Sequence, residues 1–286
     1  MSQSSKAEDT SPTSWHGSLN LVYAQRGGKT QLIHNQMRSP LKVQRPFYPE
    51  GAAVCHSVVL HTAGGIVGGD RLSLNFHLEP NAQALITTAA ASKIYRSNGL
   101  QAKQSIHMQV DAGATLEWLP QETIVFTGAI YRTDLRVELA PRASWLGWEI
   151  TRFGRSARGE KFLQGEWRSH TEVWQQGQPL WIDRQWLPGK AEIINSPHGL
   201  AGQSVVGSLV WIGQAVEPEL VEAARTLWVN AECQGQTGVT RLTSGILCRY
   251  RGSNSAEVRN WFIAVWQLLR LSFLGKPSCP PRVWQI

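Results

Sequence analysis

The chain has 286 residues, of which 42% are hydrophobic and 17% are charged, and its formal net charge is +7 at pH 7. The apolar content excludes a globally disordered chain, and the low charged fraction argues against a coiled coil. The length allows two domains, but all-β chains of this size often form one, and no linker-like segment divides the sequence.

The N-terminal segment, residues 1–14, is polar and lacks the apolar run of a signal peptide. We therefore expect a disordered tail at residues 1–14 and a single β-rich domain at residues 15–286. The cysteines at positions 55, 233, 248 and 279 form no CxxC pair, which indicates reduced thiols in a cytoplasmic protein. The most apolar stretch, residues 261–274, is too short and too polar to span a bilayer, so no membrane partner is expected.

Most of the chain alternates between apolar and polar residues with a period of two, which is typical of strands with one buried face. Residues 72–78, 102–110 and 135–139 show this alternation most clearly. Further strands are predicted at residues 19–23, 30–34, 54–60, 85–88, 116–119, 124–126, 145–153, 167–174, 180–186, 204–212 and 245–251. The predicted fold class is therefore mainly β.

The three clearest strands also end in a similar way, which suggests an internal repeat. Each ends in a short turn and restarts at an alanine four positions later; the pairs are Leu78 with Ala82, Val110 with Ala114, and Leu139 with Ala143. The turns contain Pro, Asn, Asp or Gly, all of which favour tight turns. The spacing of 32 and then 29 residues predicts strand–turn–strand units in a stacked, β-solenoid-like architecture. Ordinary hairpins with a coincidental spacing are the alternative.

Two segments in the C-terminal third show helical periodicity. The first runs from Pro218 to about Asn230, with the proline near the first helical position. The second begins near Asn254, which has capping-box spacing with Glu257, and an apolar stripe follows until Gly275. We therefore expect two α-helices in addition to the stacked sheets.

Familiar nucleotide-binding and catalytic motifs are incomplete. Gly28-Lys29-Thr30 ends like a P-loop, but Tyr23 stands where that motif needs a glycine, and the flanking strands predict a hairpin turn at residues 26–29. Neither HExxH nor GxSxG occurs, and the eight histidines are scattered, so paired zinc ligands are unsupported. We expect no enzymatic activity; a hydrolase on a β scaffold would need a reactive nucleophile in a pocket.

The most unusual segment is GGIVGGD at residues 64–70, where two glycine pairs flank two β-branched residues. Asp70 either caps a backbone amide in a tight turn or is a carboxylate held at a backbone crossing or cavity mouth. Cys55 and His61 share one face of a predicted strand but lie about 20 Å apart at strand rise, too far to share a metal. The 13 tryptophans fit either a Trp-rich core or interface hot spots.

Several motifs together give the chain a family resemblance over residues 17–286. They are RPFYPEG at 45–51, GGIVGGD at 64–70, TT at 87–88, SKIYRS at 92–97, LEWLPQETI at 116–124, GR at 154–155, GE at 159–160 and PRVW at 281–284. In this combination the sequence resembles the urease accessory protein UreD, also called UreH. Thr62-Ala63 and Ala89 stand where prolines are common in that family, so the turns beside these positions differ from its usual pattern.

The resemblance implies a helix-like stack of β-sheets with two α-helices, and a non-catalytic scaffold in urease maturation. It also implies binding to the accessory protein UreF, which recruits the GTPase UreG, and contact with the urease apoprotein. No tightly bound cofactor is expected, although Ni²⁺ would bind transiently while it is delivered to urease.

Oxygen ligands bind nickel more weakly than clustered His or Cys side chains, so a nickel passage should be lined by carboxylates. We expect such a polar passage to be lined or flanked by Asp70, Glu117, Glu122 and Glu160, with Arg155 balancing their charge. Asp70, His61 and Cys55 are weak candidates for direct metal contact.

A separate hypothesis assigns the helical stripe of Trp261, Val265, Trp266 and Leu269 to support of a partner-binding surface, although core packing would produce the same stripe. The alternative function, from another class, is a β-rich nucleic-acid-binding protein, suggested by the basic charge, the many aromatic residues and the Arg-rich segment around residue 155. The family resemblance itself implies no nucleic-acid partner.

Overall fold

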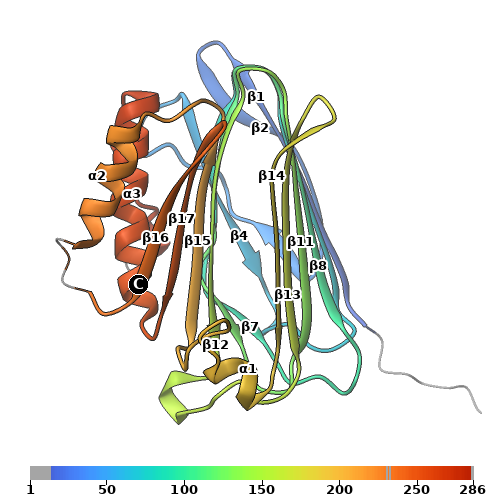
Figure 1. The fold of residues 1–286 in the computed structure, drawn as a ribbon. Coiled ribbons are helices and arrows are strands. Elements are labelled where there is room, and N and C mark those ends of the chain that lie inside the picture. The colour runs from blue at the N-terminus through green and yellow to red at the C-terminus, as the bar shows by residue number, and fades with distance from the viewer. Residues whose placement is uncertain (1–13, 230, 232, 285–286) are drawn as a thin grey trace, which may run out of the picture.

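The structure, a computed structural model, describes residues 14–229, 231 and 233–284. Apart from Ser14, the predicted tail lies outside these residues. The described chain forms two β-sheets that face each other, and helices cover the outer face of one sheet (Figure 1). The mainly β prediction is confirmed.

The seven-stranded sheet has the order β14-β13-β11-β8-β5-β1-β2. Its strands are β1 (His16–Arg26), β2 (Lys29–Arg38), β5 (Arg71–Leu78), β8 (Ala102–Val110), β11 (Ile130–Leu139), β13 (Glu166–Gln175) and β14 (Gln178–Pro188). The inner strands β1, β5, β8, β11 and β13 run parallel, whereas β2 and β14 pair antiparallel at the two edges.

The ten-stranded sheet has the order β16-β17-β15-β12-β9-β6-β4-β3, with β10 pairing to β12 and β7. Its strands are β3 (Leu41–Val43), β4 (Val54–His61), β6 (Gln83–Thr88), β7 (Ser92–Ile94), β9 (Thr115–Leu119), β10 (Thr123–Val125), β12 (Ser144–Phe153), β15 (Val205–Ile212), β16 (Gln236–Leu242) and β17 (Gly245–Gly252). Strands β4, β6, β9 and β12 run parallel.

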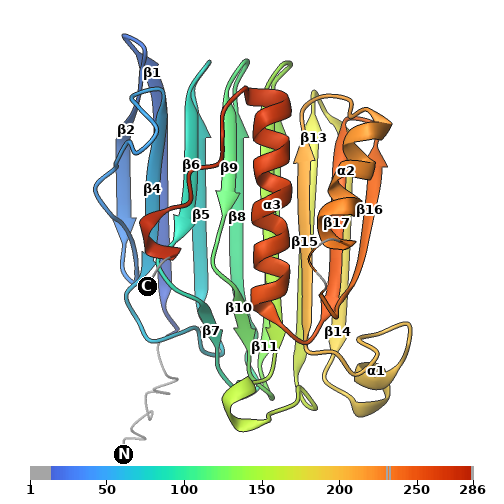
Figure 2. The same ribbon diagram turned by 90° about the vertical axis from the view of Figure 1, so that its left-hand side faces the viewer.

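Between β4 and β13 the chain alternates from one sheet to the other, so each circuit adds a parallel strand to both sheets. The result is a β-solenoid of about four turns, which confirms the predicted stacked architecture (Figure 2). Strands such as β11 bury alternate residues: Val137 and Leu139 face the interior, while Arg136 and Glu138 lie on the outer face.

The repeated turns predicted from the sequence stack at one end of the solenoid, which we call the turn end. Asn81, Gly113 and Arg142 occupy equivalent positions with φ of 62°, 73° and 65°, as a type II turn requires at its third residue. The following alanines, at 82, 114 and 143, are buried, and each amide donates back across its turn. These turns connect the two sheets, so the interpretation as ordinary hairpins is wrong.

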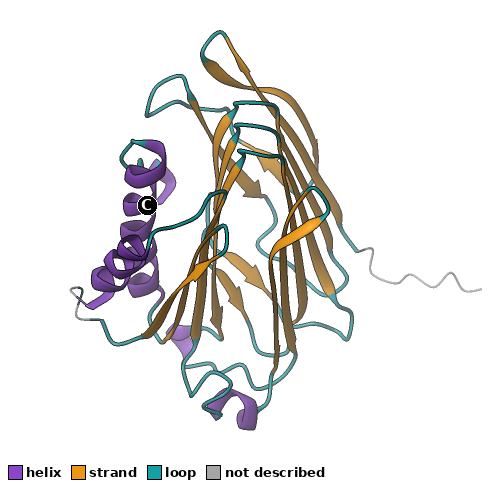
Figure 3. Ribbon diagram, turned by 45° about the horizontal axis from the view of Figure 1, so that its top comes forward, coloured by secondary structure: helices purple, strands orange, loops and turns teal. Residues whose placement is uncertain are grey.

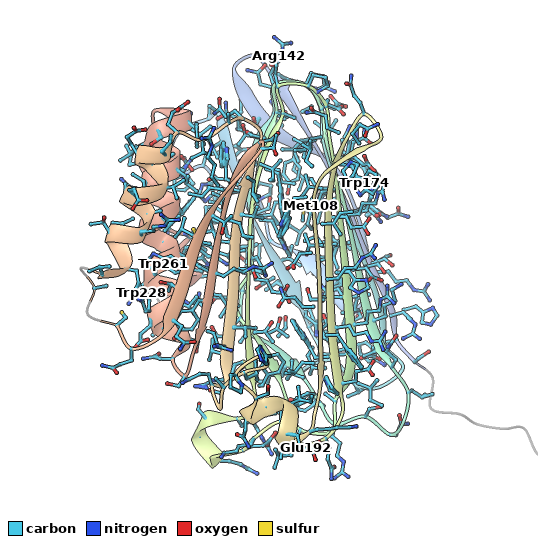
Figure 4. The ribbon with its side chains drawn as sticks, viewed as in Figure 1. Met108, Arg142, Trp174, Glu192, Trp228 and Trp261 are labelled. Atoms are coloured by element: carbon cyan, nitrogen blue, oxygen red, sulfur yellow. The ribbon has the colours of Figure 1, made fainter. Side chains whose placement is uncertain are left out.

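The opposite end of the solenoid carries longer connections, and we call it the loop end. It comprises residues 62–70, 89–101, 120–129 and 154–165, and it includes the short strands β7 and β10. Figure 4 shows Arg142 at the turn end and Glu192 near the opposite end.

Two hydrophobic cores stabilise the molecule. The first lies between the sheets and contains Leu21, Phe76 and Met108, of which Met108 is seen in the interior in Figure 4. The second lies between the ten-stranded sheet and the helices, where Trp211 and Phe262 pack. Seven of the 13 tryptophans are buried, which supports the Trp-rich core interpretation.

Among the described residues there are three α-helices, α1 (Ala191–Asn195), α2 (Pro218–Val229) and α3 (Ser255–Leu274). The two predicted helices are α2 and α3, which lie on the ten-stranded sheet (Figure 3). The predicted end of α2 at Asn230 falls outside the described residues. Expecting only two helices was wrong, because α1 has five residues and is too short for a periodic pattern.

The ends of α3 follow the sequence signals only in part. The Asn254 side chain accepts a hydrogen bond from the Ala256 amide, and Gly275 ends the helix with φ of 62°. The predicted capping box does not close, because the Glu257 carboxylate accepts from the Tyr250 hydroxyl at 3.2 Å. Glu257 therefore ties the helix start to β17.

Strands β3, β7 and β16 were not predicted. The first two have three residues each, and β16 has one buried side chain, Val239, so alternation is not visible in any of them. The hairpin turn at residues 26–29 is confirmed, because Arg26 pairs with Lys29 and both intervening glycines have positive φ.

Candidate functional site

The space between the two sheets contains a belt of polar side chains within the hydrophobic core. In the seven-stranded sheet, strand pairing places Gln104, Thr133, Ser169 and Gln185 side by side in one row. In the ten-stranded sheet, it places Glu149, Ser208 and Arg249 in a second row. Together with Asp183, these two rows are called the polar belt below.

Hydrogen bonds connect the two rows of the polar belt. The Ser169 hydroxyl donates to Glu149 Oε2 at 2.7 Å, which links β13 to β12 across the interior. Arg249 donates to Asp183 Oδ2 at 2.9 Å and to the Ser208 hydroxyl at 2.6 Å. The Arg249 cation is therefore neutralised by Asp183, whereas Glu149 has no ion pair among the described residues.

Burial raises the pKa of Glu149, because removing a carboxylate from water disfavours its charged form. The Ser169 and Thr151 hydroxyls and the Arg249 charge oppose this shift, whereas the Asp183 charge adds to it. The interior thus holds one carboxyl group whose ionisation is unfavourable until a positive charge approaches. A proton or a metal cation can supply that charge.

A cavity of about 80 Å³ lies beside the polar belt. Its polar lining includes Gln104, Tyr131, Thr133, Glu149, Ser169, Asp183 and Ser208. Trp145 also lines it, and its indole nitrogen has no hydrogen-bond partner among the described residues. The cavity is therefore rich in oxygen ligands and has one acid without a counter-ion.

A second cavity, of about 400 Å³, extends from the first toward the loop end. It is lined by residues of β4, β5, β6 and β8 together with the GGIVGGD loop, and His61 and Lys93 are among them. Thr88, Ser92 and Gln104 line both cavities, so the two adjoin. Together they extend along the stacking direction of the strands, from β4 to β14.

Of the acids predicted from the motifs, Asp70 is a backbone cap. It is buried, and its two carboxylate oxygens accept hydrogen bonds from the amides of Trp15 at 3.2 Å and Val67 at 3.0 Å. These bonds fix the GGIVGGD loop against the start of β1. The capping interpretation of this aspartate is therefore confirmed.

Glu117 and Glu122 face α3 and line neither of the two cavities. Glu117 Oε1 accepts from the Trp266 indole at 2.6 Å and lies 3.4 Å from Arg270 Nε. Burial raises the pKa of Glu117, although the Arg270 charge opposes the shift. Glu122 forms an ion pair with Arg259 at the start of the helix.

Arg155 and Glu160 form an ion pair at the loop end, so the structure brings these two predicted residues together. Glu160 also accepts from the Thr127 amide at 2.8 Å, which ties two neighbouring loops. It lines a third cavity, of about 310 Å³, near α1. The five predicted passage residues are therefore not brought together in one place; of them, only Arg155 and Glu160 pair with each other.

Cys55 and His61 lie on β4 and point to the same side, as predicted. Cys55 is fully buried, and burial raises the pKa of its thiol, which disfavours the thiolate that binds metals. His61 Nδ1 lies 3.1 Å from the Ala63 carbonyl oxygen, and His61 Nε2 is buried without a partner among the described residues.

The stripe of α3 is part of the second core. Trp261, Val265, Trp266 and Leu269 are all at most 2% exposed, so they hold the helix on the sheet and form no surface themselves. Their proposed support of a partner-binding surface stays a prediction, since it would act through the opposite face of the helix.

A buried charge cluster beneath the C-terminal half of α3 escaped the sequence analysis. Arg270 is 1% exposed and donates to Glu50 Oε2 at 2.6 Å, and the other oxygen of Glu50 lies 2.6 Å from His56 Nε2. Arg270 and His56 lower the pKa of the Glu50 carboxyl, although burial opposes them. Arg270 stands in the apolar stripe of the helix, which was a sign that it has a partner there.

Glu149, Asp183 and Arg249 were likewise not predicted as site residues. A signal existed for Glu149, because it shares its parity in β12 with the buried residue Trp145 rather than with a solvent-facing side chain. Gln104 interrupts the buried face of β8 in the same way. No sequence signal shows that these interruptions meet, because that depends on how the two sheets are aligned.

Among residues 14–229, 231 and 233–284, no three His, Cys, Asp or Glu side chains form a group that could hold a metal ion. The four cysteines are free thiols. In the same part of the chain, no helix has the length and apolar character needed to cross a bilayer.

Comparison with known proteins identifies relatives over almost the whole sequence. Residues 16–285 match the model of the family described as UreD urease accessory protein. The urease accessory protein UreD of Nostoc punctiforme is 74% identical over 272 residues, which cover 95% of this chain and 96% of that protein. The UreD protein of Acaryochloris marina is 58% identical over the full length of both chains, and that of Dechloromonas aromatica is 41% identical over 95% of this chain and 94% of that protein.

Proposed function

The chain belongs to the UreD family of urease accessory proteins, and from this membership we propose that it is a non-catalytic scaffold that passes nickel to urease through its interior. A role in urease maturation follows from the family. The transfer route is our proposal, and the observation that carries it is the polar belt with its unpaired carboxyl group beside two adjoining cavities.

The ligands along this route suit a cation that has to move on. Hydroxyl, amide and carboxylate oxygens hold a divalent transition metal less tightly than clustered His or Cys side chains, and they exchange faster. Glu149 offers one carboxylate, and Ser169, Thr133 and Gln104 offer neutral oxygen atoms nearby. A single anionic ligand attracts the ion without trapping it.

The charge balance of the belt supports the same role. Asp183 is already bound to Arg249, so the net charge that a nickel ion meets is that of Glu149 alone. Burial raises the pKa of Glu149, and a dication bound beside it favours the ionised carboxylate and so opposes that shift. Nickel binding at this carboxyl group should therefore weaken as pH falls.

In this proposal the chain bridges the urease apoprotein and the accessory proteins UreF and UreG. The GKT segment is a hairpin turn, so a P-loop is not formed there, and the GTPase UreG supplies nucleotide hydrolysis. Nickel is the cargo of the complex and not a resident cofactor. The protein acts in the cytoplasm, where its free thiols remain reduced.

The residues predicted from the motifs flank the route. Asp70 and the Arg155–Glu160 pair hold the loops at the loop end, beside the larger cavity and the third cavity. Glu117 and Glu122 hold α3 against the outer face of the ten-stranded sheet. Their substitution would disturb the walls of the passage rather than its ligands.

Replacing Glu149 by glutamine tests the route. The amide keeps the shape of the carboxylate but removes its charge, so we expect nickel-dependent urease activation in a co-expression system to fall about tenfold or more at limiting nickel. Co-purification with UreF, UreG and the urease apoprotein should be unchanged. The measurement is urease activity and nickel content of the purified urease.

Glu138→Gln is the matched control, because Glu138 lies on the outer face of β11 and pairs with Arg136. It should leave activation unchanged. Normal activation by the Glu149→Gln variant, in a complex of normal composition, would show that nickel does not use this route.

A further inference from the structure

The loop end of the solenoid carries four of the large apolar side chains that are exposed in the described part of the chain. Trp15, Val67, Leu100 and Leu163 are 49%, 46%, 51% and 46% exposed there. Hydrogen bonds hold the loops that carry them in neighbouring layers, since the Ser97 amide donates to Gly128 and the Gly128 amide donates to Gln164. The Trp15 amide donates to Asp70 of the adjacent loop. These four side chains thus lie on neighbouring loops, and they are called the apolar strip below.

The same loops carry positive charge that is not neutralised by ion pairs within the part of the chain that the structure describes. Lys93, Arg96, Arg158 and Lys161 are exposed, and none of them has an ion pair among the described residues. Cations on the outer face of the seven-stranded sheet differ, because they pair with acids there; they are Lys103, Arg132, Arg136, Arg168 and Arg184.

The acidic residues of the loop end are fewer than its basic residues, and each acid already has hydrogen-bond or ion-pair partners. Asp70 accepts two backbone amides, Glu122 pairs with Arg259, and Glu160 pairs with Arg155. Residues 62–70, 89–101, 120–129 and 154–165 contain five Lys or Arg and three Asp or Glu, so these loops carry a formal net charge of +2. A surface with unbalanced charge around an apolar strip has the composition of a protein interface.

We propose that the loop end is a docking face for a protein surface that is acidic and has an apolar centre. The apolar strip would supply the buried contact, and the four cations would steer and orient the partner. Three of the four apolar side chains favour a protein over single-stranded nucleic acid, because Val67, Leu100 and Leu163 are aliphatic; Trp15 is the one member of the strip with a ring on which a base could stack.

Docking at this face has a consequence for the interior, which rests on the proposed nickel route. Lys93 and the GGIVGGD loop also line the larger cavity, so the cavity reaches the basic loops. Unneutralised cations there repel a free dication. An acidic partner seated on the face reverses that potential, so nickel enters only from a docked partner.

Charge reversal of three loop-end cations tests the docking face. The variant carries Lys93→Glu, Arg158→Glu and Lys161→Glu, and its partners are purified urease apoprotein, UreF and UreG, each titrated separately. At about 0.1 M salt, where exposed charges still interact, we expect affinity for one of these proteins to fall about tenfold or more. The dependence of that binding on salt should also weaken.

The matched control carries Arg26→Glu, Lys29→Glu and Arg142→Glu at the turn end, with the same change of net charge. It should bind each partner as the unchanged chain does. Thermal unfolding of both variants shows whether they are folded. A second variant carries Leu100→Ser and Leu163→Ser. It should lower the affinity for the same partner without changing how that affinity depends on salt.

Undiminished binding of all three proteins by the folded loop-end variant would overturn the proposal. So would a loss confined to a single-stranded oligonucleotide, which would make the basic loops a nucleic-acid site. The result is distinct from failure of the nickel route, because Glu149→Gln leaves the complex assembled, whereas the loop-end variant prevents assembly.

Discussion

Glu149 is a single residue whose charge links stability to pH. Burial raises its pKa in the folded protein, so over some pH range the unfolded chain is ionised while the folded chain keeps its proton. Below the unfolded pKa both states are neutral. As pH rises from there toward the folded pKa, the unfolded state loses its proton first, and the free energy of unfolding falls.

Glu149→Gln removes this dependence, because an amide does not titrate. We expect the variant to unfold at a free energy higher by about 1 kcal/mol or more at pH 8, with the difference vanishing near pH 4. Urea unfolding at several pH values measures it. A constant difference between the two proteins across that range would contradict a raised pKa. Glu138→Gln, on the outer face, should show no such trend.

At the level of single residues, sequence patterns predicted local structural roles better than they predicted which distant residues lie close together. Asp70 follows a glycine-rich turn and accepts a hydrogen bond from the Val67 amide within it, as the capping interpretation predicted. Glu149 and Asp183 come from strands of different sheets, and both line the first cavity. Their proximity depends on the alignment of two whole sheets, and no short-range pattern encodes that.

The position of α3 on the ten-stranded sheet depends on the guanidinium group of Arg270, which is buried among apolar residues. Arg270 Nη2 donates to Glu50 at 2.6 Å, and Nη1 donates to the Pro277 carbonyl at 2.8 Å. The guanidinium thus joins the helix to the loop before β4 and to the segment that follows the helix. Losing it would leave the buried carboxyl groups of Glu50 and Glu117 without their guanidinium partner.

Arg270→Met keeps most of the side-chain volume and tests this dependence. We expect a loss of about 3–5 kcal/mol in the free energy of unfolding, because one partner of a buried pair is removed while the carboxylates remain. Arg184→Met is the control, since Arg184 is 65% exposed and lies 3.6 Å from Glu172; it should cost about 0.5 kcal/mol or less. Equal losses in guanidinium chloride unfolding would refute the buried cluster as the anchor.

Elements with a strong periodic pattern could be predicted, and those without one could not. The spaced turns at Asn81 and Gly113 predicted a stack because a repeat needs equal geometry at each level. Strand β16 has one buried side chain and exists because β17 offers it a pairing edge. Helix α1 is a local turn between β14 and β15.

The whole molecule is a stack with two open edges in the seven-stranded sheet. Strand β8 has neighbours on both sides and contributes Met108 and Val110 to the core, whereas β2 lies at the edge with nearly all its side chains at least partly exposed. Backbone amides in the edge strand β2 should therefore become exposed by local unfolding, whereas those in the central strands should become exposed only when the whole protein unfolds.

Amide hydrogen exchange measures this gradient. We expect the slowest exchange in β8 and its neighbours β5 and β11, approaching the global free energy of unfolding, and faster exchange by about tenfold or more in β2. Uniform exchange along the stack would instead indicate one cooperative unit without independent edges.

The family resemblance and the strand periodicity gave the architecture of the whole molecule. Neither could give the cavities, because packing of the interior decides whether space remains beside polar side chains such as Gln104 and Ser169. The unpaired charge of the loop end was equally hidden, since the net charge of +7 does not say which cations find partners.

The stacking of parallel strands also sets the length of the solenoid in fixed steps. Each circuit of the chain adds one strand to both walls, and neighbouring strands are about 4.8 Å apart. The adjoining cavities follow that same axis. On the proposed nickel route, a relative with one more circuit would carry its ion one strand spacing further, so the length of the route would change only in whole strand spacings.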